Sequence, residues 1–375
     1  MSISPFDHPI LSGLLGDEAL AALFSADAEL AAMLRFEAAL AEAEGEAGVI
    51  PADAAEAIES ALADYRPDFG RLRAAAARDG VAVPELVASL REAVGEPHAK
   101  HVHFGATSQD VIDSGLALRL SEALAILDAR IGAVIDALGT LEARDGAIAT
   151  MGHTRMQAAV SVPAVRKIAS WRDPLSRHRA RLAEVREGVL LLHFGGASGT
   201  LDKLGDKAEE VSAGLGRRLG LPVPPRARHS ERDGIVAFAS WLSLVTGSLG
   251  KMGHDVALLA QSEVGEVKLA SGGGSSAMPH KVNPVGAETL VALARFNATL
   301  VSGMHQSLVH ENERSGAAWT LEWMLLPQMV VATGAALRVA ADLAAAIGFV
   351  RRGASGASQG PGRGPATAPS SSIAE

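Results

Sequence analysis

Residues 272–284 read GGGSSAMPHKVNP, and they lie between two long segments whose apolar residues recur with a helical period. The three glycines let the backbone take left-handed conformations and approach a ligand closely. The loop also offers backbone N–H groups, hydroxyls and the ammonium group of Lys281, a combination that suits an anionic ligand. Asn283 and Pro284 predict the N-cap and the first residue of the following helix. A plain Gly/Ser linker before a helix fits the same composition, so the rest of the chain must decide between the two.

The segments around this loop predict unusually long helices. Residues 116–141 and 235–259 carry large apolar side chains at alternating spacings of three and four, close to a heptad pattern. A third such segment runs from Pro284 to about Leu308, and a fourth covers about 321–347. A helix of about thirty residues is roughly 45–50 Å long, too long for an ordinary compact globule. The pattern therefore predicts an elongated all-α bundle that is shared between subunits.

The composition agrees with helices and excludes several classes of protein. Aromatic residues make up only 4% of the 375, so the core must be built from Ala, Leu and Val, which favours helices over a sheet. The chain has no cysteine, which excludes disulfides, thiolate metal sites and thiol nucleophiles. A net charge of −9 argues against nucleic acid as a partner. Arg338 and Asp342 interrupt the best apolar run, and no signal peptide is recognised, so a soluble cytoplasmic protein is predicted.

The helical patterns and their breaks divide the chain into three predicted parts. Residues 1–100 predict a small all-helical domain, 101–348 a central long-helix bundle, and 349–375, rich in Gly, Ser, Pro and Ala, a disordered tail. Pro67 and Gly70 are expected to interrupt the helices of the first part, where no strand is predicted. The helices expected there cover residues 29–48, 51–65 and 84–94.

Polar turns are predicted at the ends of the long helices, at residues 101–110, 151–157, 272–284 and 310–316. The second is expected to extend as a turn over 145–163. Antiparallel helices bring alternate ends together, so one chain should place some turns at each end, and turns of different subunits can meet when bundles associate. Ser108 or Asp110 can cap the helix after the first turn. Its positive end would then lie beside Thr107, Ser108 and Gln109, a natural carboxylate site, although an ordinary capped turn fits as well.

Three of these stretches together resemble the conserved regions of the fumarase/aspartase superfamily. They are residues 105–110 (GATSQD), 152–157 (GHTRMQ) and 274–284 (GSSAMPHKVNP). Their order and spacing agree with that superfamily over about residues 1–348. The resemblance implies an all-α fold, an elongated long-helix bundle of the fumarase/aspartase type. The C-terminal domain is expected to be truncated, because little follows Gly348 except the tail.

Within the superfamily, the chain is most similar to the bacterial 3-carboxy-cis,cis-muconate cycloisomerases. Residues 103–110, 194–201 and 313–323 carry this similarity. It implies a cofactor-free addition–elimination next to a carboxylate, with no metal, in the protocatechuate branch of the β-ketoadipate pathway. One carboxylate of a tricarboxylate substrate attacks its own double bond to close a lactone, and a proton is delivered to the adjacent carbon. It also implies a homotetramer with active sites shared between subunits, and neither nucleic acid nor membrane as a partner.

The same resemblance assigns the chemistry to the glycine-rich loop. Ser275 is implied as the acid/base, a hydroxyl donor in lactonisation and an alkoxide in the reverse direction. A free serine is far too weak a base, so the loop must close and surround Ser275 with positive potential. Lys281 and Asn283, together with the N–H groups of the loop, are the candidates for stabilising the dianionic aci-carboxylate.

Further residues are implied as substrate contacts, the arginines because they bind carboxylates in a bidentate fork. They are His103, Thr107, Ser108, Gln109, Thr154, Arg155, Gln157, Arg232, Ser276, Met278, Glu313 and Arg314. Adenylosuccinate lyases usually read Thr-His-Gly-Gln where this chain has residues 154–157, so Arg155 replaces their helper histidine and His153 is offset by two. This departure speaks against adenylosuccinate cleavage and suits a substrate with three carboxylates.

Two other interpretations stay open from the sequence. One is a C–N or C–O lyase of the same fold that acts on an adenylosuccinate-like or other substituted succinate. The other is a non-catalytic structural homologue, in which the intact polar loop would have no purpose.

Overall fold

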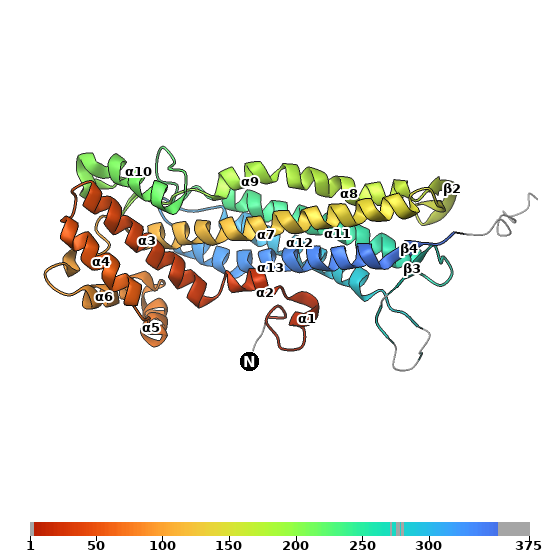
Figure 1. Ribbon diagram of the computed structural model, residues 1–375, viewed down its shortest axis with the longest axis horizontal. Coiled ribbons are helices and arrows are strands. Elements are labelled where there is room, and N and C mark those ends of the chain that lie inside the picture. Colours follow the sequence, from red (N-terminus) through yellow and green to blue (C-terminus); the bar gives the residue numbers. More distant parts are fainter. Residues whose placement is uncertain (1–3, 271, 275–277, 279–280, 352–375) are drawn as a thin grey trace, which may run out of the picture.

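The computed structural model describes residues 4–270, 272–274, 278 and 281–351. They form an elongated bundle whose long helices run side by side along the longest axis, with a smaller helical part at one end and two short sheets at the other (Figure 1). The predicted all-α long-helix fold is confirmed. The bundle helices are α7 (Ser108–Asp145), α8 (Val165–Ala180), α9 (Leu182–Val189), α11 (Asp233–Leu259), α12 (Val285–Ser307) and α13 (Gly316–Ala346).

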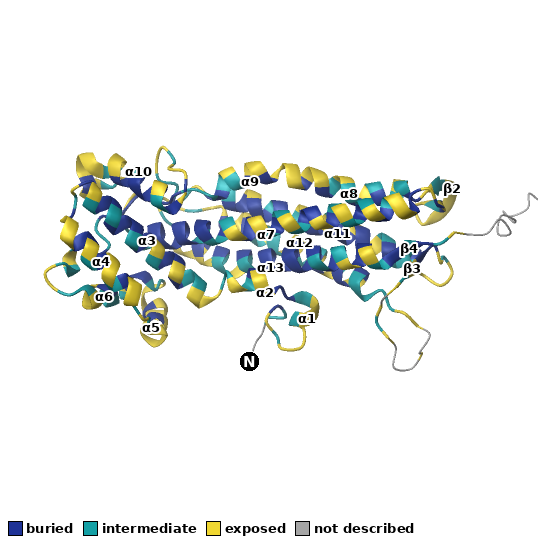
Figure 2. Ribbon diagram, in the orientation of Figure 1, coloured by how far each residue is buried: buried dark blue, intermediate teal, exposed yellow. Residues whose placement is uncertain are grey.

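The apolar stripes that predict the long helices form the core of the bundle. α11 packs along α12, α12 along α13, and α13 along α7, while α8 and α9 lie against α7 and α11. Leu124, Leu127 and Ile131 of α7 and Val245 and Leu249 of α11 are all fully buried (Figure 2). Burying one such side chain contributes about 1.5–3 kcal/mol, so packing along these stripes holds the helices together.

α7 is one continuous helix of 38 residues, which makes it about 57 Å long at 1.5 Å per residue. It begins at Ser108, where the Thr107 N–H donates a hydrogen bond of 2.9 Å to Asp110 Oδ2. The N-cap is Thr107, not Ser108 or Asp110 as predicted, and Asp110 takes part as the third helical residue of a capping box with Thr107. Its carboxylate also complements the positive end of the helix dipole.

Two of the long helices contain a proline without ending there. α8 continues through Pro174. α13 contains Pro327 and begins earlier than its predicted start near Leu321. The earlier start has a local cause, because the Ser315 side chain accepts a hydrogen bond of 3.2 Å from the Ala318 N–H and so caps the helix at Gly316.

The smaller helical part lies beside the start of α7. α3 packs against α4, α7 and α10, around a second hydrophobic cluster that contains Phe36, Leu40 and Leu86. Its elements are α3 (Ala26–Glu46), α4 (Ala52–Asp64), α5 (Phe69–Asp79), α6 (Val83–Val94), α10 (Ala208–Leu219) and the 3₁₀ turns η1 (Ala99–His101) and η2 (Asp202–Lys207). The short helices α1 (Ser12–Leu15) and α2 (Glu18–Ala22) lie instead along the bundle, where both contact α13 (Figure 1).

The helices predicted in the first hundred residues correspond to α3, α4 and α6, and the sequence missed α5. The expectation that Gly70 breaks the helical pattern is wrong, because Gly70 lies in the first turn of α5. Asp68 makes this helix possible by accepting hydrogen bonds from the N–H groups of Gly70 (2.8 Å) and Arg71 (3.1 Å). Gly80 ends it with a left-handed φ of 77°.

The polar turn predicted over residues 145–163 is also wrong, because the structure has an antiparallel hairpin there. It consists of β1 (Ala149–Thr154) and β2 (Gln157–Pro163). Most of its residues are exposed on both faces, so the sequence shows no alternation of apolar and polar residues. A second small sheet pairs β3 (Val267–Leu269) with β4 (Ile347–Phe349).

The glycine-rich loop closes on itself at its base. Gly273 and Asn283 exchange two backbone hydrogen bonds of 3.0 and 2.9 Å. α12 begins at Val285 with Pro284 before it, so the helix starts one residue later than Asn283 and Pro284 predict. Residues 271, 275–277 and 279–280 lie outside the described part of the chain, as does the predicted tail from residue 352 onward.

Two bundle helices, α11 and α13, are long and apolar enough to cross a membrane by length and composition alone. Most of each lies inside the bundle, where their apolar side chains pack against neighbouring helices (Figure 2). This burial is typical of the core helices of a soluble protein.

Two glycines of α11 offer a matched test of helix packing. A Cβ atom built on Gly253 would lie 2.4 Å from the Ala287 carbonyl oxygen of α12, whereas one on Gly247 meets no atom within 4 Å. We expect Gly253→Ala to destabilise the fold by about 1–3 kcal/mol through overpacking. Gly247→Ala should instead stabilise it by about 0.5–1 kcal/mol, because alanine favours a helix. Thermal unfolding measures the change in Tm of each variant relative to the wild type. Equal changes in the two variants would contradict the close contact between α11 and α12.

Candidate functional site

The polar turns fall into two groups at opposite ends of the bundle, as expected for antiparallel helices. Residues 101–110 and 310–315 lie together where α7 and α13 begin, and we call this the α7-start end. The β1–β2 hairpin and the glycine-rich loop lie where α7 and α11 end, which we call the hairpin end (Figure 1). Each end is described in turn.

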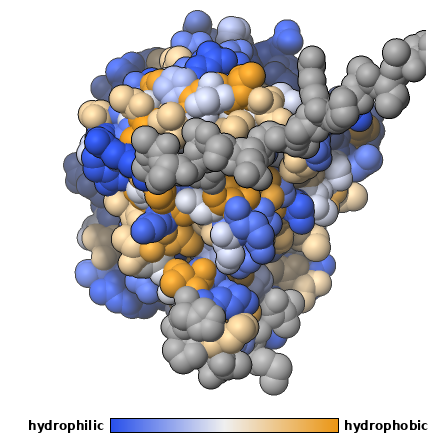
Figure 3. All heavy atoms as spheres, turned by 90° about the vertical axis from the view of Figure 1, so that its right-hand side faces the viewer, coloured by the Kyte–Doolittle hydropathy of each residue, from blue (hydrophilic) through white to orange (hydrophobic). Residues whose placement is uncertain are grey.

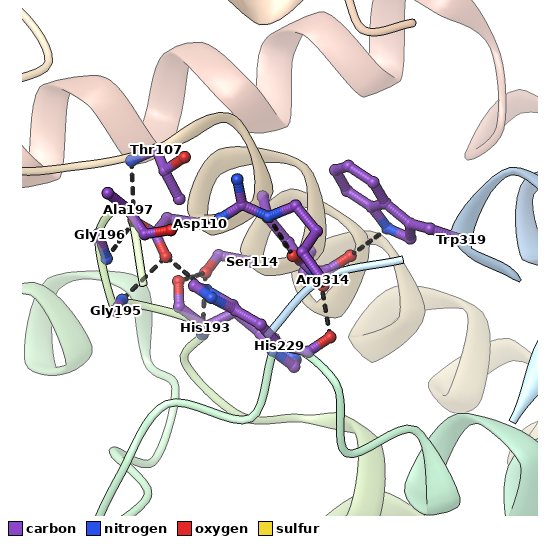
Figure 4. Close-up of polar contacts among 12 residues, drawn as sticks. Thr107, Asp110, Ser114, His193, Gly195, Gly196, Ala197, His229, Arg314 and Trp319 are labelled. Carbon is purple, nitrogen blue, oxygen red and sulfur yellow. Dashed lines mark hydrogen bonds and ion pairs between the residues drawn. The ribbon is translucent and has the colours of Figure 1, made fainter. Parts of the chain in front are cut away.

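Asp110 is the centre of the α7-start end. It is fully buried, and each of its two carboxylate oxygens accepts two hydrogen bonds (Figure 4). Oδ1 accepts from the Gly195 N–H (2.8 Å) and His229 Nε2 (2.7 Å), and Oδ2 from the N–H groups of Gly196 (3.0 Å) and Thr107 (2.9 Å). Four donors compensate the burial of this charge. They also fix the loop at residues 193–201 against the start of α7.

Gln109 points into the protein. It is fully buried, and its amide nitrogen donates to Asp113 Oδ2 (3.0 Å) and to the His229 carbonyl oxygen (2.8 Å). Its amide oxygen accepts a hydrogen bond of 2.8 Å from Nε of Arg314. The structure therefore gives Gln109 an internal role, holding Arg314, in place of the open position that the sequence assigns to it.

Beneath Gln109 lies a buried ion cluster made of Arg232, Asp113 and Glu322. Arg232 donates to Asp113 Oδ2 (2.7 Å) and to both Glu322 oxygens (2.9 and 2.6 Å), and all three side chains are at most 2% exposed. Trp319 Nε1 also donates to Asp113 Oδ1 (3.0 Å). Arg232 is thus paired inside the protein, so the substrate contact that the sequence assigns to it has no exposed donor in this structure.

Burial and charge change the pKa of Asp113 and of His193, which lies beside the cluster. Burial alone would raise the pKa of Asp113, but the charge and hydrogen bonds of Arg232 outweigh it and lower the pKa to about 2. Burial lowers the pKa of the neighbouring His193 to about 4, so its imidazole is neutral at neutral pH. Asp113 therefore stays ionised and remains the charge partner of Arg232.

Other predicted residues of this end remain accessible. Thr107, Ser108 and Arg314 are half-buried, and Glu313 is exposed. Arg314 also reaches the Ala197 carbonyl oxygen at 3.5 Å, and Figure 4 shows its guanidinium beside the start of α7.

His103, in the turn before α7, contacts Glu37 through its ring nitrogen Nδ1. A guanidinium, an imidazole and a helix N-terminus therefore lie near one another, which suits carboxylate binding.

At the hairpin end, Arg155 and Met156 form the two-residue turn between β1 and β2. Both have left-handed φ values, 49° and 65°, as a type I′ turn requires. Such backbone is strained for residues other than glycine and is often found at functional sites. Thr154 and Gln157 pair across the turn, and all four side chains are exposed. The three predicted contacts of this hairpin are thus displayed together at its tip.

A cavity of about 660 Å³ lies between this hairpin, α8 and α11. Its lining includes the cations Arg155, Arg166, Lys167 and Lys251, against the carboxylate of Asp255. Lys251 forms an ion pair with Asp255. In the view onto this end, hydrophilic side chains surround hydrophobic ones on the surface that is not drawn in grey (Figure 3). The excess of cations makes this cavity suited to an anion.

Glu266 connects the hairpin to the strand that leads into the glycine-rich loop. It is 4% exposed, and its Oε1 accepts a hydrogen bond of 2.7 Å from the Met151 N–H of β1. The Met151 carbonyl oxygen accepts a hydrogen bond of 3.0 Å from Lys167 Nζ. Both backbone groups of Met151 are therefore held by charged side chains, which fixes the base of the hairpin.

The glycine-rich loop is only partly described. Ser275 and Ser276 lie outside the described residues, so their assignments stay predictions. Lys281 is exposed, and Met278 is 43% exposed. Asn283 is half-buried, and its side-chain nitrogen donates to the Gly274 carbonyl oxygen at 3.4 Å. The loop thus presents Lys281 to solvent at the same end as Arg155.

Sequence reasoning missed several charged residues of the α7-start end, chiefly Glu37, Asp113, His229 and Glu322. Asp113 and Glu322 carried a signal, because each is an acidic residue within an apolar helical segment. Glu37 is likewise buried on the apolar face of α3. Within the described parts of the chain, no group of three His, Asp or Glu side chains is arranged to hold a metal ion.

Comparison with known proteins agrees with this architecture. The family described as Lyase matches residues 17–296. A 3-carboxy-cis,cis-muconate cycloisomerase of Pseudomonas aeruginosa is 44% identical over 86% of this chain and 72% of its own. The crystal structure of the 3-carboxy-cis,cis-muconate lactonizing enzyme from Pseudomonas putida superposes with a TM-score of 0.85, at 40% identity over 91% of this chain and 77% of that one. An N-acetyl-S-(2-succino)cysteine lyase of Enterococcus italicus is 32% identical over 86% of this chain and 71% of its own.

The chain belongs to the lyase family, and it is an enzyme of the fumarase/aspartase type. The resemblance that the three sequence motifs predict is therefore confirmed. Among these relatives, those that are most similar in sequence and in structure share the name of cycloisomerase or lactonizing enzyme.

The buried ion cluster yields a stability prediction. Arg232→Met removes the cation and leaves the carboxylates of Asp113 and Glu322 buried without it, which should cost about 3–5 kcal/mol. Arg218→Met is the control, because Arg218 pairs with the partly exposed Glu42 and Glu46, and such pairs contribute about 1 kcal/mol or less. Urea unfolding at neutral pH measures the loss of unfolding free energy in both variants.

The pH dependence of this difference has a definite sign. Arg232 lowers the pKa of Asp113 in the folded protein, so its stabilisation is present above the ordinary pKa of an aspartate and is lost as the pH falls towards 2. The stability gap between the wild type and Arg232→Met should therefore shrink on acidification below about pH 4. If the difference in unfolding free energy between the wild type and Arg232→Met stays constant with pH, Arg232 does not stabilise the ionised form of Asp113.

Proposed function

We propose that this chain is a 3-carboxy-cis,cis-muconate cycloisomerase, which converts 3-carboxy-cis,cis-muconate to 4-carboxymuconolactone. The observation that carries the proposal is the 44% identity over 86% of the chain to an enzyme of that name. The cationic cavity and Arg155 at the tip of the hairpin support it, because they suit a substrate with several carboxylates. The reaction would place the enzyme in the cytoplasm, in the protocatechuate branch of the β-ketoadipate pathway.

The proposed mechanism is a cofactor-free addition. One substrate carboxylate oxygen attacks its own double bond and closes the lactone, so the electron pair of that bond moves to the neighbouring carbon. Ser275 donates its proton to this carbon, and in the reverse direction its alkoxide removes the proton. Charge builds up on the adjacent carboxylate as a dianionic aci-carboxylate. Lys281, Asn283 and the N–H groups of the loop stabilise that charge.

The arrangement of the two ends supports a shared active site. Within one chain, α7 separates the α7-start end from the hairpin end by about 57 Å. Arg314 and Lys281 therefore cannot contact one small substrate from the same subunit. We place the α7-start end of one subunit beside the hairpin end of another, in a homotetramer whose sites are built from several chains. Exposed apolar side chains on the bundle, Leu244 and Met324, offer surface for this association.

A spectrophotometric assay tests the proposed activity directly. The conjugated diene of 3-carboxy-cis,cis-muconate should lose its absorbance as the lactone forms. If this absorbance persists and adenylosuccinate or a 2-succino thioether is cleaved instead, the protein is a lyase of the same fold on a substituted succinate. The 32% identical N-acetyl-S-(2-succino)cysteine lyase makes that the second candidate. If none of these reacts, the non-catalytic interpretation gains support.

Ser275→Ala should reduce kcat by about 10³-fold or more, because it removes the proton donor without changing the binding groups. Size-exclusion chromatography with light scattering should still show the tetramer. Ser262→Ala is the control for loss of a hydroxyl, since Ser262 is exposed and lies outside the loop. Near-normal turnover in Ser275→Ala would remove serine from the mechanism.

Complementation tests the shared site. Ser275→Ala affects the hairpin end and Arg314→Met the α7-start end, so each homotetramer should be nearly inactive. After the two are unfolded and reassembled together, about a quarter of the sites should contain an intact residue at both ends, and activity should return in that proportion. A mixture of Ser275→Ala with Lys281→Met, both at the hairpin end, should not recover. Equal absence of recovery in both mixtures would contradict the shared site.

A further inference from the structure

A buried carboxylate lies directly behind His103. Glu37, on α3, is 1% exposed, and its Oε1 lies 2.6 Å from Nδ1 of His103. The His103 side chain is 12% exposed, and its backbone has a left-handed φ of 61°. An L-residue keeps such a conformation only when the surrounding structure holds it. The pair therefore joins the smaller helical part to the turn that precedes α7.

Burial makes this contact important for Glu37. An ionised carboxylate away from water is costly unless a partner compensates it. Within the described residues, the second oxygen of Glu37, Oε2, has no hydrogen-bond partner. The compensation of its charge therefore depends on Oε1 and on the ring of His103.

The same helix carries a second buried carboxyl group, Glu44. Glu44 follows Glu37 by two helical turns and is also buried, and neither of its oxygens has a hydrogen-bond partner in the described structure. Burial, and then the negative charge of Glu37, raises the pKa of Glu44 to about 9. Glu44 is therefore neutral at neutral pH. Glu37 differs from it by having the imidazole of His103 beside its carboxylate.

The groups that face His103 come from three helices. Burial lowers the pKa of His103, but the charge and hydrogen bond of Glu37 on α3, together with Asp110 on α7, outweigh it. Arg91 on α6 acts in the opposite direction. The resulting pKa is raised, so the imidazolium form persists to higher pH than in a free histidine.

We propose that Glu37 is a positioning residue for the proposed reaction: it accepts the Nδ1–H of His103 and fixes the ring so that Nε2–H donates to a substrate carboxylate. Because Nδ1 is taken by Glu37, Nε2 is the ring nitrogen left for a ligand. The buried carboxylate also favours the positively charged form of the ring, which matches an anionic substrate. The identity of that substrate rests on the proposed function, whereas the coupling of Glu37 to His103 does not.

The first test measures the coupling without turnover. The protein is labelled with ¹³Cε1-histidine, and the His103 signal is assigned by its loss in His103→Gln. In wild type its titration midpoint should lie above that of a free histidine. In Glu37→Gln, which keeps the shape and removes the charge, it should fall by about one unit, a tenfold change in proton affinity.

Two controls match this variant. Glu44→Gln alters a buried carboxyl on the same helix that is already neutral, so it should leave the His103 midpoint unchanged. Glu42→Gln removes a charge from the partly exposed side of α3, where Glu42 pairs with Arg218, and should also leave it unchanged. Of these three variants, only Glu37→Gln should change the titration midpoint of His103.

The second test follows the pH profile of KM and kcat for 3-carboxy-cis,cis-muconate. Loss of the imidazolium should raise KM, and in Glu37→Gln this rise should begin about one pH unit lower, giving up to tenfold higher KM between the two midpoints. The kcat should change little, because the contact binds ground and transition states alike. A fall in kcat at all pH values, with no shift of the profile, would indicate a merely structural role.

The outcomes separate this inference from the proposed function. An unchanged His103 midpoint in Glu37→Gln overturns the inference whatever the protein catalyses. A shifted midpoint with no turnover of the substrate supports the coupling and contradicts the proposed function. Should Glu37→Gln fail to fold by circular dichroism, the wild-type titration decides, because a His103 midpoint at or below that of a free histidine overturns the inference.

Discussion

The continuous length of α7 is the constraint on which the rest of the arrangement depends. A helix of 38 residues with fully buried leucines along one stripe cannot bend its two ends together. It therefore separates the turn at Thr107 from the hairpin that carries Arg155. One end offers a helix N-terminus with Arg314, and the other offers exposed cations and the glycine-rich loop. The homotetramer proposed above would bring these two ends of different chains together on one molecule.

The α7-start end is organised by buried charges. Two of the four hydrogen bonds that Asp110 accepts come from Gly195 and Gly196 and fix the loop at 193–201. Asp113 with Arg232 fixes Gln109, which in turn holds Arg314. Removing either partner of such a buried pair is costly, so the cluster has one stable arrangement. The cluster orients Arg314 through Gln109, and if Arg314 binds the substrate as proposed, such preorganisation would lower the cost of binding.

Sequence patterns revealed the long helices because burial along one stripe repeats over many turns and leaves a strong signal, as from Leu120 to Leu141. They failed where one side chain decides the structure. Asp68 makes α5 possible despite Gly70, and Ser315 sets the start of α13. The hairpin gave no signal because it is exposed on both faces. In the site, motif residues such as Arg155 and Arg314 were found, whereas the inward orientation of Gln109 and Arg232 depends on partners more than eighty residues away in sequence.

The two ends supply positive potential in different physical ways. The chain carries a net charge of −9, so attraction of an anion must come from local groups. At the hairpin end the cations are exposed side chains around a cavity, and water and salt weaken their field until another surface covers them. At the α7-start end the cationic groups are partly buried, and each is held by an internal partner: His103 by Glu37 and Arg314 by Gln109. A partner that is buried can hold a donor in place without filling the side that faces the ligand. In the shared site that we propose, the α7-start end would set the orientation of a carboxylate, and the exposed cations of a neighbouring chain's hairpin end would supply most of the attraction.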